Sequence, residues 1–185
     1  MNPEGLVPER TALLLIDWQV DFAAPDGAMA RAGKDTAPAR MALEQAAALL
    51  AAAREAGVMV VFARLQGSDL CAAGTPGAEF FGIAPRPGER LVTKTRYSAF
   101  AGTGLTGTLK GAGIDRLVLA GLTTECCVAS SAWAAFEADF QVAVAADACA
   151  AYDQKLHRST LRALALSGAG LLPVAAIAAF WKNNK

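Results

Sequence analysis

The sequence has little charge and no excess of either sign. Its 185 residues include 17 Lys and Arg against 17 Asp and Glu, and charged residues make up 18% of the chain. Because no block of like charge occurs, neither nucleic acid nor an anionic membrane surface is an expected partner. We expect instead a small molecule, or another copy of the chain, as the partner.

Long apolar runs and an export signal are also missing. No run reaches the roughly 18 apolar residues that a membrane helix needs. The first ten residues hold two prolines and two glutamates, and they lack the basic start and apolar stretch of a signal peptide. Four cysteines without such a signal favour free thiols in a reducing compartment, so we expect a cytoplasmic protein.

Metal-ligand spacing is absent as well. Cys126 and Cys127 are adjacent and form no C-x-x-C pair, and neither Cys71 nor Cys149 has a close cysteine neighbour. We therefore expect no structural metal. The one histidine, His157, falls at the start of a predicted helix, where it is expected on the surface or at the helix cap and not in a Cys-His catalytic pair.

Hydrophobic residues make up 54% of the chain, which favours one domain over residues 1–185 with a well-buried sheet. Short apolar runs alternate with helical patterns along its whole length. The expected strands lie at 13–17, 58–62, 91–94, 117–120, 142–145 and near 170, and the expected helices at 38–57, 103–109, 128–138, 154–167 and up to 180. This alternation predicts the α/β class: a three-layer α/β/α arrangement around a mostly parallel, doubly wound sheet.

A cysteine at a strand-to-helix junction is the most informative local feature. The strand before Gly121 ends there, and a helical pattern starts at Val128, which places Cys127 near a helix N-terminus. The helix dipole and free N–H groups at such a position favour a thiolate and can hold an oxyanion. Asp17 and Lys94 also follow predicted strands, so all three residues are expected to share the rim at the carboxyl ends of the strands.

Three motifs in this order resemble the isochorismatase-like cysteine hydrolases, in particular their amidohydrolase branch, which includes ureidoacrylate and N-carbamoylsarcosine amidohydrolases. The motifs are Asp17-Trp-Gln-Val-Asp-Phe22, Lys94-Thr-Arg-Tyr-Ser-Ala-Phe100, and Gly121-Leu-Thr-Thr-Glu-Cys-Cys-Val128 followed by Ser131-Ala132. The likeness covers nearly the whole chain. It implies an Asp17, Lys94 and Cys127 catalytic triad, with Cys126 outside it.

The resemblance further implies a cis peptide at Leu122-Thr123, with the N–H groups of Thr123 and Cys127 forming an oxyanion hole. It also suggests that substrate contacts come from four residues that lie in or beside the first two motifs: Gln19, Phe22, Tyr97 and Phe100. The resemblance also implies that the protein forms a homo-oligomer, either a dimer or a tetramer. Its nicotinamidases bind a metal through an Asp and histidines after the second strand, but residues 64–70 contain no histidine, so we expect no metal or cofactor.

The expected activity is hydrolysis of the C–N bond of a small amide, carbamoyl or ureido compound. Lys94 and the helix N-terminus would lower the pKa of the Cys127 thiol from about 8.5, and Asp17 would move protons. Attack by Cys127 would then leave a thioester for water to hydrolyse. Three alternatives remain open: vinyl-ether hydrolysis of the isochorismatase type, a non-catalytic binding subunit, and a redox-sensing thiol with Cys126 as resolving partner.

Overall fold

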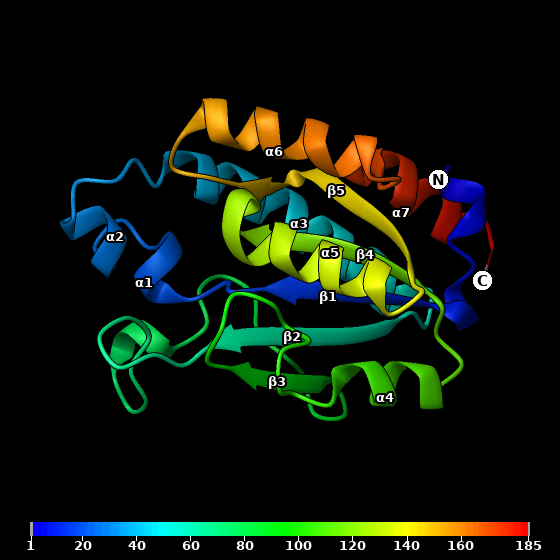
Figure 1. The fold of residues 1–185 in the computed structure, drawn as a ribbon, viewed down its shortest axis with the longest axis horizontal. Coiled ribbons are helices and arrows are strands. Elements are labelled where there is room, and N and C mark those ends of the chain that lie inside the picture. The colour runs from blue at the N-terminus through cyan, green and yellow to red at the C-terminus, as the bar shows by residue number, and fades with distance from the viewer. Residues whose placement is uncertain (1, 185) are drawn as a thin grey trace.

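Six strands form one sheet in which every neighbouring pair of strands is parallel. The computed structural model describes residues 2–184 (Figure 1). The strands, in the spatial order β3-β2-β1-β4-β5-β6, are β1 (Thr11–Ile16), β2 (Met59–Leu65), β3 (Arg90–Lys94), β4 (Arg116–Leu122), β5 (Gln141–Ala150) and β6 (Gly170–Leu172). No helix within residues 2–184 is long and apolar enough to cross a membrane.

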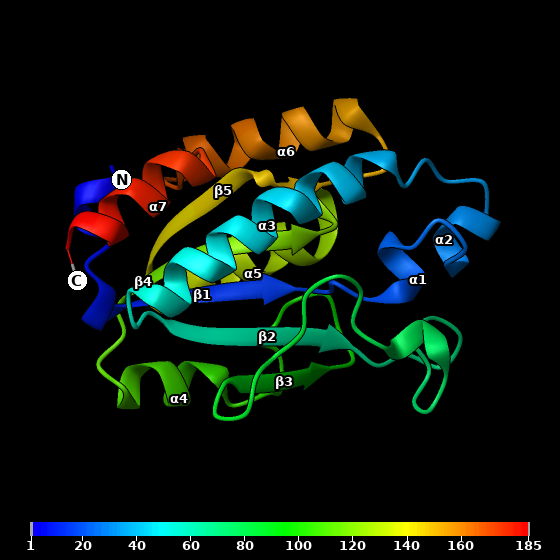
Figure 2. The same ribbon diagram turned by 180° about the vertical axis from the view of Figure 1, so that it is seen from behind.

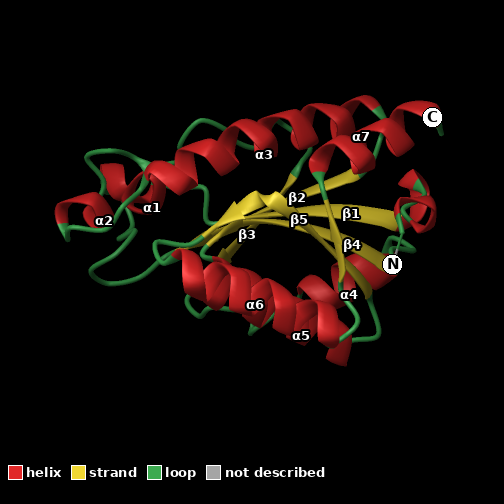
Figure 3. Cartoon of the chain, turned by 90° about the horizontal axis from the view of Figure 1, so that it is seen from above, coloured by secondary structure: helices red, strands yellow, loops and turns green. Residues whose placement is uncertain are grey.

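Helices cover both faces of the sheet, as Figure 3 shows. On one face lie α3 (Ala37–Glu55) and α7 (Val174–Asn183); on the other lie α4 (Leu105–Gly111), α5 (Ala129–Glu137) and α6 (Gln154–Leu166). The central strand β1 shows why two layers are needed, because Leu13 and Leu15 pack into one core while Leu14 and Ile16 pack into the other. The expected α/β/α class with a parallel sheet is confirmed.

The order of the strands reverses between β1 and β4, which creates a switch point at the centre of the sheet. Ile16, the last residue of β1, lies opposite Ala63 of β2 and Gly121 of β4. An added Cβ at Gly121 would lie 2.2 Å from the Ile16 carbonyl oxygen, so only glycine allows the two strands this approach. The residues that follow β1 and β4 therefore emerge side by side.

Some elements differ from the expected ones. The helices α1 (Val20–Ala23) and α2 (Ala28–Arg31) were not expected, because four residues are too few to show a helical period. The strand β5 continues to Ala150, five residues beyond its expected end. Its second half is rich in alanine, which has low strand propensity, and it pairs with Gly121 and Leu122 only after a register irregularity in the β4–β5 ladder.

The expected long loop connects β2 to β3 and lies beside α1 (Figure 2). It contains one 3₁₀ turn, η3 (Pro76–Ala78), and it pairs with the chain just after β1. The N–H of Val20 donates to the Glu79 carbonyl at 2.9 Å, and that of Phe81 donates to the Trp18 carbonyl at 2.9 Å. The loop is thereby fixed close to the carboxyl ends of the strands, where function was expected.

Candidate active site

Asp17 is the first residue after β1, and its side chain is completely buried. Its φ of 55° lies in the left-handed region, which Asp tolerates better than most residues. The backbone N–H donates to the Ala63 carbonyl at 2.8 Å, so the residue is held by the neighbouring strand β2. This backbone conformation turns the carboxylate away from the strand path and into the rim of the sheet.

Lys94 ends β3, two strands away from β1, and its side chain reaches across the end of β2. The Nζ atom donates to Asp17 Oδ2 at 2.7 Å, to the Arg96 carbonyl at 3.2 Å and to Cys127 Sγ at 3.4 Å. An ammonium group has three protons, and each one has an acceptor here. The Lys94 side chain is 0% exposed, so its charge is compensated inside the protein by Asp17.

Cys127 lies in a π-helical turn, η4 (Thr124–Val128), directly before α5. The N–H groups of Cys126 and Val128 both donate to the Thr123 carbonyl, at 3.1 and 3.2 Å. Among residues 2–184, no loop, turn or cap hydrogen bond uses the N–H of Thr123 or Cys127, the two expected oxyanion donors. The Leu122–Thr123 peptide bond is cis, as the family resemblance implied.

Ser131 ties this turn to the segment after β3. Its hydroxyl donates to the Cys127 carbonyl at 2.7 Å and accepts from the Ala99 N–H at 2.9 Å. Ser131 is fully buried, so both hydrogen bonds are protected from water. The sequence motif included this residue, but its positioning role depends on a tertiary contact with the segment after Lys94.

The electrostatics of the cluster differ from the expectation in one respect. Burial, and then the neighbouring Asp17 carboxylate, raise the pKa of the Cys127 thiol, and Lys94 lowers it by less. Burial also raises the pKa of Asp17, with Lys94 acting in the opposite direction. The expected lowering of the thiol pKa is therefore wrong, because one ammonium compensates one anion and Asp17 already supplies it. Both shifts favour the protonated forms, and Lys94 acts against them by favouring the ionised form of each group.

A cavity of about 520 Å³ opens beside Cys127. Its lining comes from the segments after β1, β2, β3, β4 and β5, and consists of Phe22, Met29, Lys34, Leu65, Leu70, Tyr97, Thr123, Glu125, Cys126, Cys127, Tyr152, Asp153 and Leu156. Phe22 and Tyr97, two of the expected substrate contacts, are in this wall. The phenol of Tyr152 donates to the Phe22 carbonyl at 2.8 Å and fixes the wall on that side.

The other two expected substrate contacts, Gln19 and Phe100, lie outside this cavity. The Gln19 side chain is buried and uses its amide on backbone groups: it accepts from the Leu65 N–H at 2.8 Å and donates to the carbonyls of Leu65 and Ala78 at 2.9 and 3.0 Å. Phe100 packs against Phe140 in the core, with ring centroids 6.0 Å apart. Gln19 therefore joins β1, β2 and the long loop, and Phe100 contributes to packing.

His157 contacts the turn that carries the cysteine, a role that its position in the sequence did not reveal. Its Nδ1 lies 2.8 Å from the hydroxyl of Thr124, and Thr124 is fully buried. Burial lowers the pKa of His157, and the nearby Arg158 lowers it further, so the imidazole is neutral at neutral pH. It does not line the cavity beside Cys127.

The residues of this cavity do not fit a metal ion of the kind that nicotinamidases hold. Within residues 2–184, no three or more His, Cys, Asp and Glu side chains are grouped closely enough to bind one. Asp69, the acidic residue of the segment after β2, is exposed and accepts from Ser68. Asp69 therefore has no second ligand of the type that Zn²⁺ requires.

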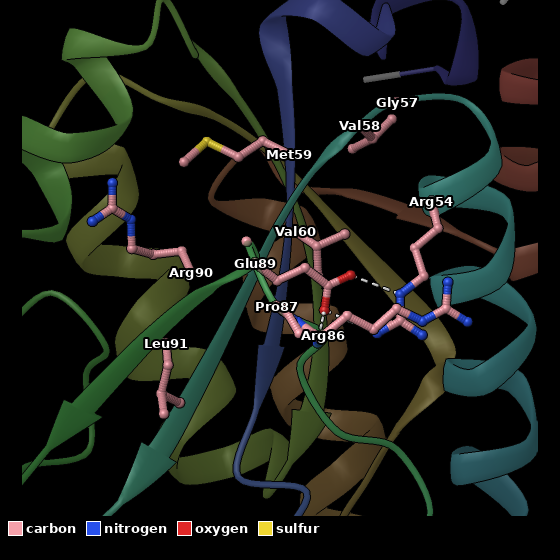
Figure 4. Close-up of a pocket in the computed structure, with 11 residues that line it drawn as sticks. Arg54, Gly57, Val58, Met59, Val60, Arg86, Pro87, Glu89, Arg90 and Leu91 are labelled. Atoms are coloured by element: carbon pink, nitrogen blue, oxygen red, sulfur yellow. Dashed lines mark hydrogen bonds and ion pairs between the residues drawn. The ribbon is translucent and has the colours of Figure 1, made fainter.

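A larger hollow of about 740 Å³ lies at the opposite end of β2 and β3 (Figure 4). There the Glu89 carboxylate accepts from Arg54 Nε and Nη2 at 2.7 and 2.9 Å and from the Arg86 N–H at 2.7 Å. These hydrogen bonds lower the pKa of Glu89, Arg54 contributing most. Its carboxylate is thus engaged in fixing the turn before β3, far from the carboxyl ends of the strands, and we do not assign the chemistry to this hollow.

The fold and the buried Asp, Lys and Cys cluster define an α/β protein with a nucleophile candidate at the switch point of its sheet. Residues 11–176 match the Isochorismatase domain family. Streptothricin hydrolase from Streptomyces noursei is 37% identical over 145 residues, covering 77% of this chain and 50% of that protein. Ureidoacrylate amidohydrolase RutB from Methylobacterium radiotolerans is 30% identical over 194 residues, covering 86% and 75%.

Solved structures agree with these relatives. An isochorismatase family protein from Desulfovibrio vulgaris superposes with a TM-score of 0.82 and 32% identity, covering 91% of this chain and 96% of that one. The chain belongs to the isochorismatase family. The expected family, with an amidohydrolase among the relatives, is confirmed. This chain spans half the length of the streptothricin hydrolase that it matches.

Proposed function

We propose that this protein is a cysteine-dependent amidohydrolase that cleaves the C–N bond of a small amide, carbamoyl or ureido compound. Cys127 is the nucleophile, Asp17 the general base and acid, and Lys94 the cation that balances their shared negative charge. The observation that carries this proposal is the position of Lys94 Nζ, which is 2.7 Å from Asp17 Oδ2 and 3.4 Å from Cys127 Sγ, with the side chains of Lys94 and Asp17 fully buried beside the cavity.

In the first half of the reaction, Asp17 removes the thiol proton as Sγ forms a bond to the carbonyl carbon. Asp17 Oδ2 is held by Lys94, whereas Oδ1 has no hydrogen-bond partner among the described residues and is free to accept the proton. The N–H groups of Thr123 and Cys127 hold the oxyanion. The C–N bond then breaks, Asp17 returns the proton to the leaving nitrogen, and a thioester on Cys127 remains.

In the second half, water replaces the amine in the cavity. Asp17 takes a proton from this water, whose oxygen attacks the thioester carbon, and the same N–H groups hold the second oxyanion. The C–S bond breaks, the acid leaves, and Asp17 returns the proton to Sγ. The raised pKa of Asp17 supports this double use, because a carboxyl whose pKa is closer to neutrality both accepts and releases a proton more readily.

The test is ammonia or amine release from a panel of small amides and ureido compounds, with Cys126→Ala as the matched control for Cys127→Ala. We expect loss of turnover by about 1,000-fold or more in Cys127→Ala and by about 100-fold or more in Asp17→Asn. Cys126→Ala should stay within a few-fold of the wild type. Full turnover in Cys127→Ala would refute the thiol mechanism, and isochorismate in the same panel identifies a vinyl-ether hydrolase.

A further inference from the structure

Glu125 is an acidic residue in the turn that carries Cys127, and it forms no ion pair with any residue from 2 to 184. It lies in η4 two residues before Cys127 and lines the same cavity. Its Oε2 atom is buried and has no hydrogen-bond partner among the described residues, and none of their ion pairs involves Glu125. A carboxylate oxygen removed from water without a partner is costly, so such an atom marks a position where a ligand can supply one.

The other polar groups of the cavity wall are already used or lie at its rim. Asp153 is exposed and caps α6, its Oδ1 accepting from the N–H groups of Lys155 and Leu156 at 2.7 and 3.1 Å. Tyr152 donates to the Phe22 carbonyl, and Glu125 adds to burial in raising its pKa, which places the Glu125 carboxylate near this phenol. Lys34 is exposed. Glu125 is half-buried, and its Oε2 is thus a buried acceptor in this wall that has no partner among the described residues.

The charged side chains that line the cavity carry a net negative charge. Asp17 and Lys94 compensate each other below it, and the wall then carries Lys34 against Glu125 and Asp153. One negative charge is in excess. The remaining wall includes the apolar side chains of Phe22, Met29, Leu65, Leu70 and Leu156, which suit an aliphatic segment.

We propose that Glu125 is a specificity-determining residue that binds a cationic nitrogen, an ammonium or guanidinium group, of the substrate. This inference rests on the proposed function, because it describes the substrate whose amide carbon Cys127 attacks. A cationic N–H donor supplies both the charge and the hydrogen bond that the buried oxygen lacks, and such charge-assisted bonds are stronger than neutral ones. The substrate class is therefore a small amide with a short aliphatic segment and a cationic nitrogen.

Charge-selective labelling of Cys127 tests this without a substrate. In a Cys126→Ala background, the Cys127 thiolate attacks a methanethiosulfonate, forming a mixed disulfide and releasing methanesulfinate. We compare the 2-aminoethyl, methyl and 2-sulfonatoethyl reagents by mass spectrometry, each rate divided by that of a small free thiol. We expect the cationic reagent to be favoured over the neutral one by about tenfold or more, and the anionic one to be disfavoured.

Two variants show which carboxylate causes the preference for the cationic reagent. Glu125→Gln keeps the shape and should bring the cationic-to-neutral ratio to within about twofold of unity. Asp153→Asn removes an exposed, solvent-screened charge from the rim, keeps the helix cap and should lower the ratio by less than about twofold. The proposal is overturned by equal labelling of the wild type by the cationic and neutral reagents, which needs no variant, or by a preference that survives in Glu125→Gln. Absence of any amide hydrolysis would instead refute the proposed function, and the labelling ratio would still decide the role of Glu125.

Discussion

Lys94 Nζ lies 2.7 Å from Asp17 Oδ2, although the two residues are 77 positions apart and lie at the ends of strands β3 and β1, which are not neighbours. Neither side chain is exposed, so this is a fully buried ion pair. Such pairs contribute little net stability, because desolvation offsets their attraction, but removing one partner leaves a buried charge uncompensated. The pair is therefore best understood as a functional arrangement that the rest of the fold stabilises.

Replacement of Lys94 by alanine should affect both stability and catalysis. We expect a loss of about 3 to 5 kcal/mol in the free energy of unfolding, because Asp17 is left buried and unpaired. The free energy is measured by urea denaturation, and turnover should fall by at least about 100-fold.

Lys110 is the control for Lys94. Its Nζ is 4.0 Å from Asp139, and the two side chains are 49% and 92% exposed. Lys110→Ala should change stability by less than about 1 kcal/mol and leave turnover unchanged. Equal effects of the two substitutions would contradict the role assigned to Lys94.

The pH dependence of kcat/KM should report the buried pair. In the proposed mechanism the active form has an ionised Asp17 and a protonated Cys127, so activity should rise as Asp17 loses its proton and fall as Cys127 does. Burial raises both pKa values. The midpoint on the acid side of the profile should therefore lie above 3.8, the ordinary pKa of Asp, and the midpoint on the alkaline side above 9.0, the ordinary pKa of Cys. The profile is recorded with a neutral amide, since a titrating substrate would add its own limb.

Iodoacetamide labelling of Cys127 in the free protein gives an independent check of the alkaline limb. Its midpoint should lie above that of an ordinary thiol, because the thiolate forms next to the Asp17 carboxylate. Asp17→Asn removes the carboxylate and should move the midpoint downward. A wild-type midpoint clearly below that of a small free thiol measured in the same way, or an upward shift in Asp17→Asn, would contradict a neutral thiol beside an ionised Asp17.

His157 offers a direct titration, because it is the only histidine in the chain. Its imidazole signals in NMR should titrate with a midpoint below 6.5, since burial and then Arg158 disfavour the charged form. As the pH falls, the unfolded chain binds this proton before the folded protein does. The free energy of unfolding is therefore unaffected by the titration of His157 above about pH 6.5, and it declines as the pH falls from there toward the lowered pKa of the folded state. A midpoint at or above 6.5 would show that the imidazole is more solvated than the structure indicates.

The hydrogen bond between His157 and Thr124 can be tested by a double-mutant cycle. His157→Ala and Thr124→Val each remove one partner of the 2.8 Å contact and should each cost about 1 kcal/mol of stability. The double variant should lose less stability than the two single variants together, because the first substitution has already broken the hydrogen bond that the second would break. Full additivity would show that the contact contributes nothing.

Activity should be insensitive to metal chelators. The segment after β2 offers Asp69 without a histidine, and His157 is engaged with Thr124. Incubation with EDTA followed by desalting should leave kcat/KM within error of the untreated protein, and added Zn²⁺ should not raise it. Loss of activity that Zn²⁺ restores would require a metal site that these donors do not explain.

The sequence predicted the cluster of Asp17, Lys94 and Cys127 because apolar runs mark parallel strands, and the ends of such strands meet at one rim. It did not predict the pKa direction, because it revealed the cation but not the burial of the thiol beside a carboxylate. The contacts of Gln19 were missed for a related reason. Its motif places it next to Asp17, and only the tertiary structure shows that its amide bonds to backbone groups of Leu65 and Ala78.

The free oxygen of Glu125 and the contact of His157 depend on side-chain packing between distant elements. The cavity brings together segments that follow five different strands, so no local pattern predicts which side chains face it. The sequence indicated only the turn itself, because Thr124 and Glu125 lie between Gly121, where the strand was expected to end, and Cys127.

The central claim is that Cys127 carries a covalent acyl intermediate. The most direct measurement is acid quenching during amide turnover, followed by peptide mass spectrometry of the segment that contains Cys126 and Cys127. The account predicts an acyl adduct on Cys127, present in wild type and Cys126→Ala, absent in Cys127→Ala, and converted to a hydroxamate when hydroxylamine is added. Turnover that persists in Cys127→Ala, or an adduct located on Cys126, would contradict it.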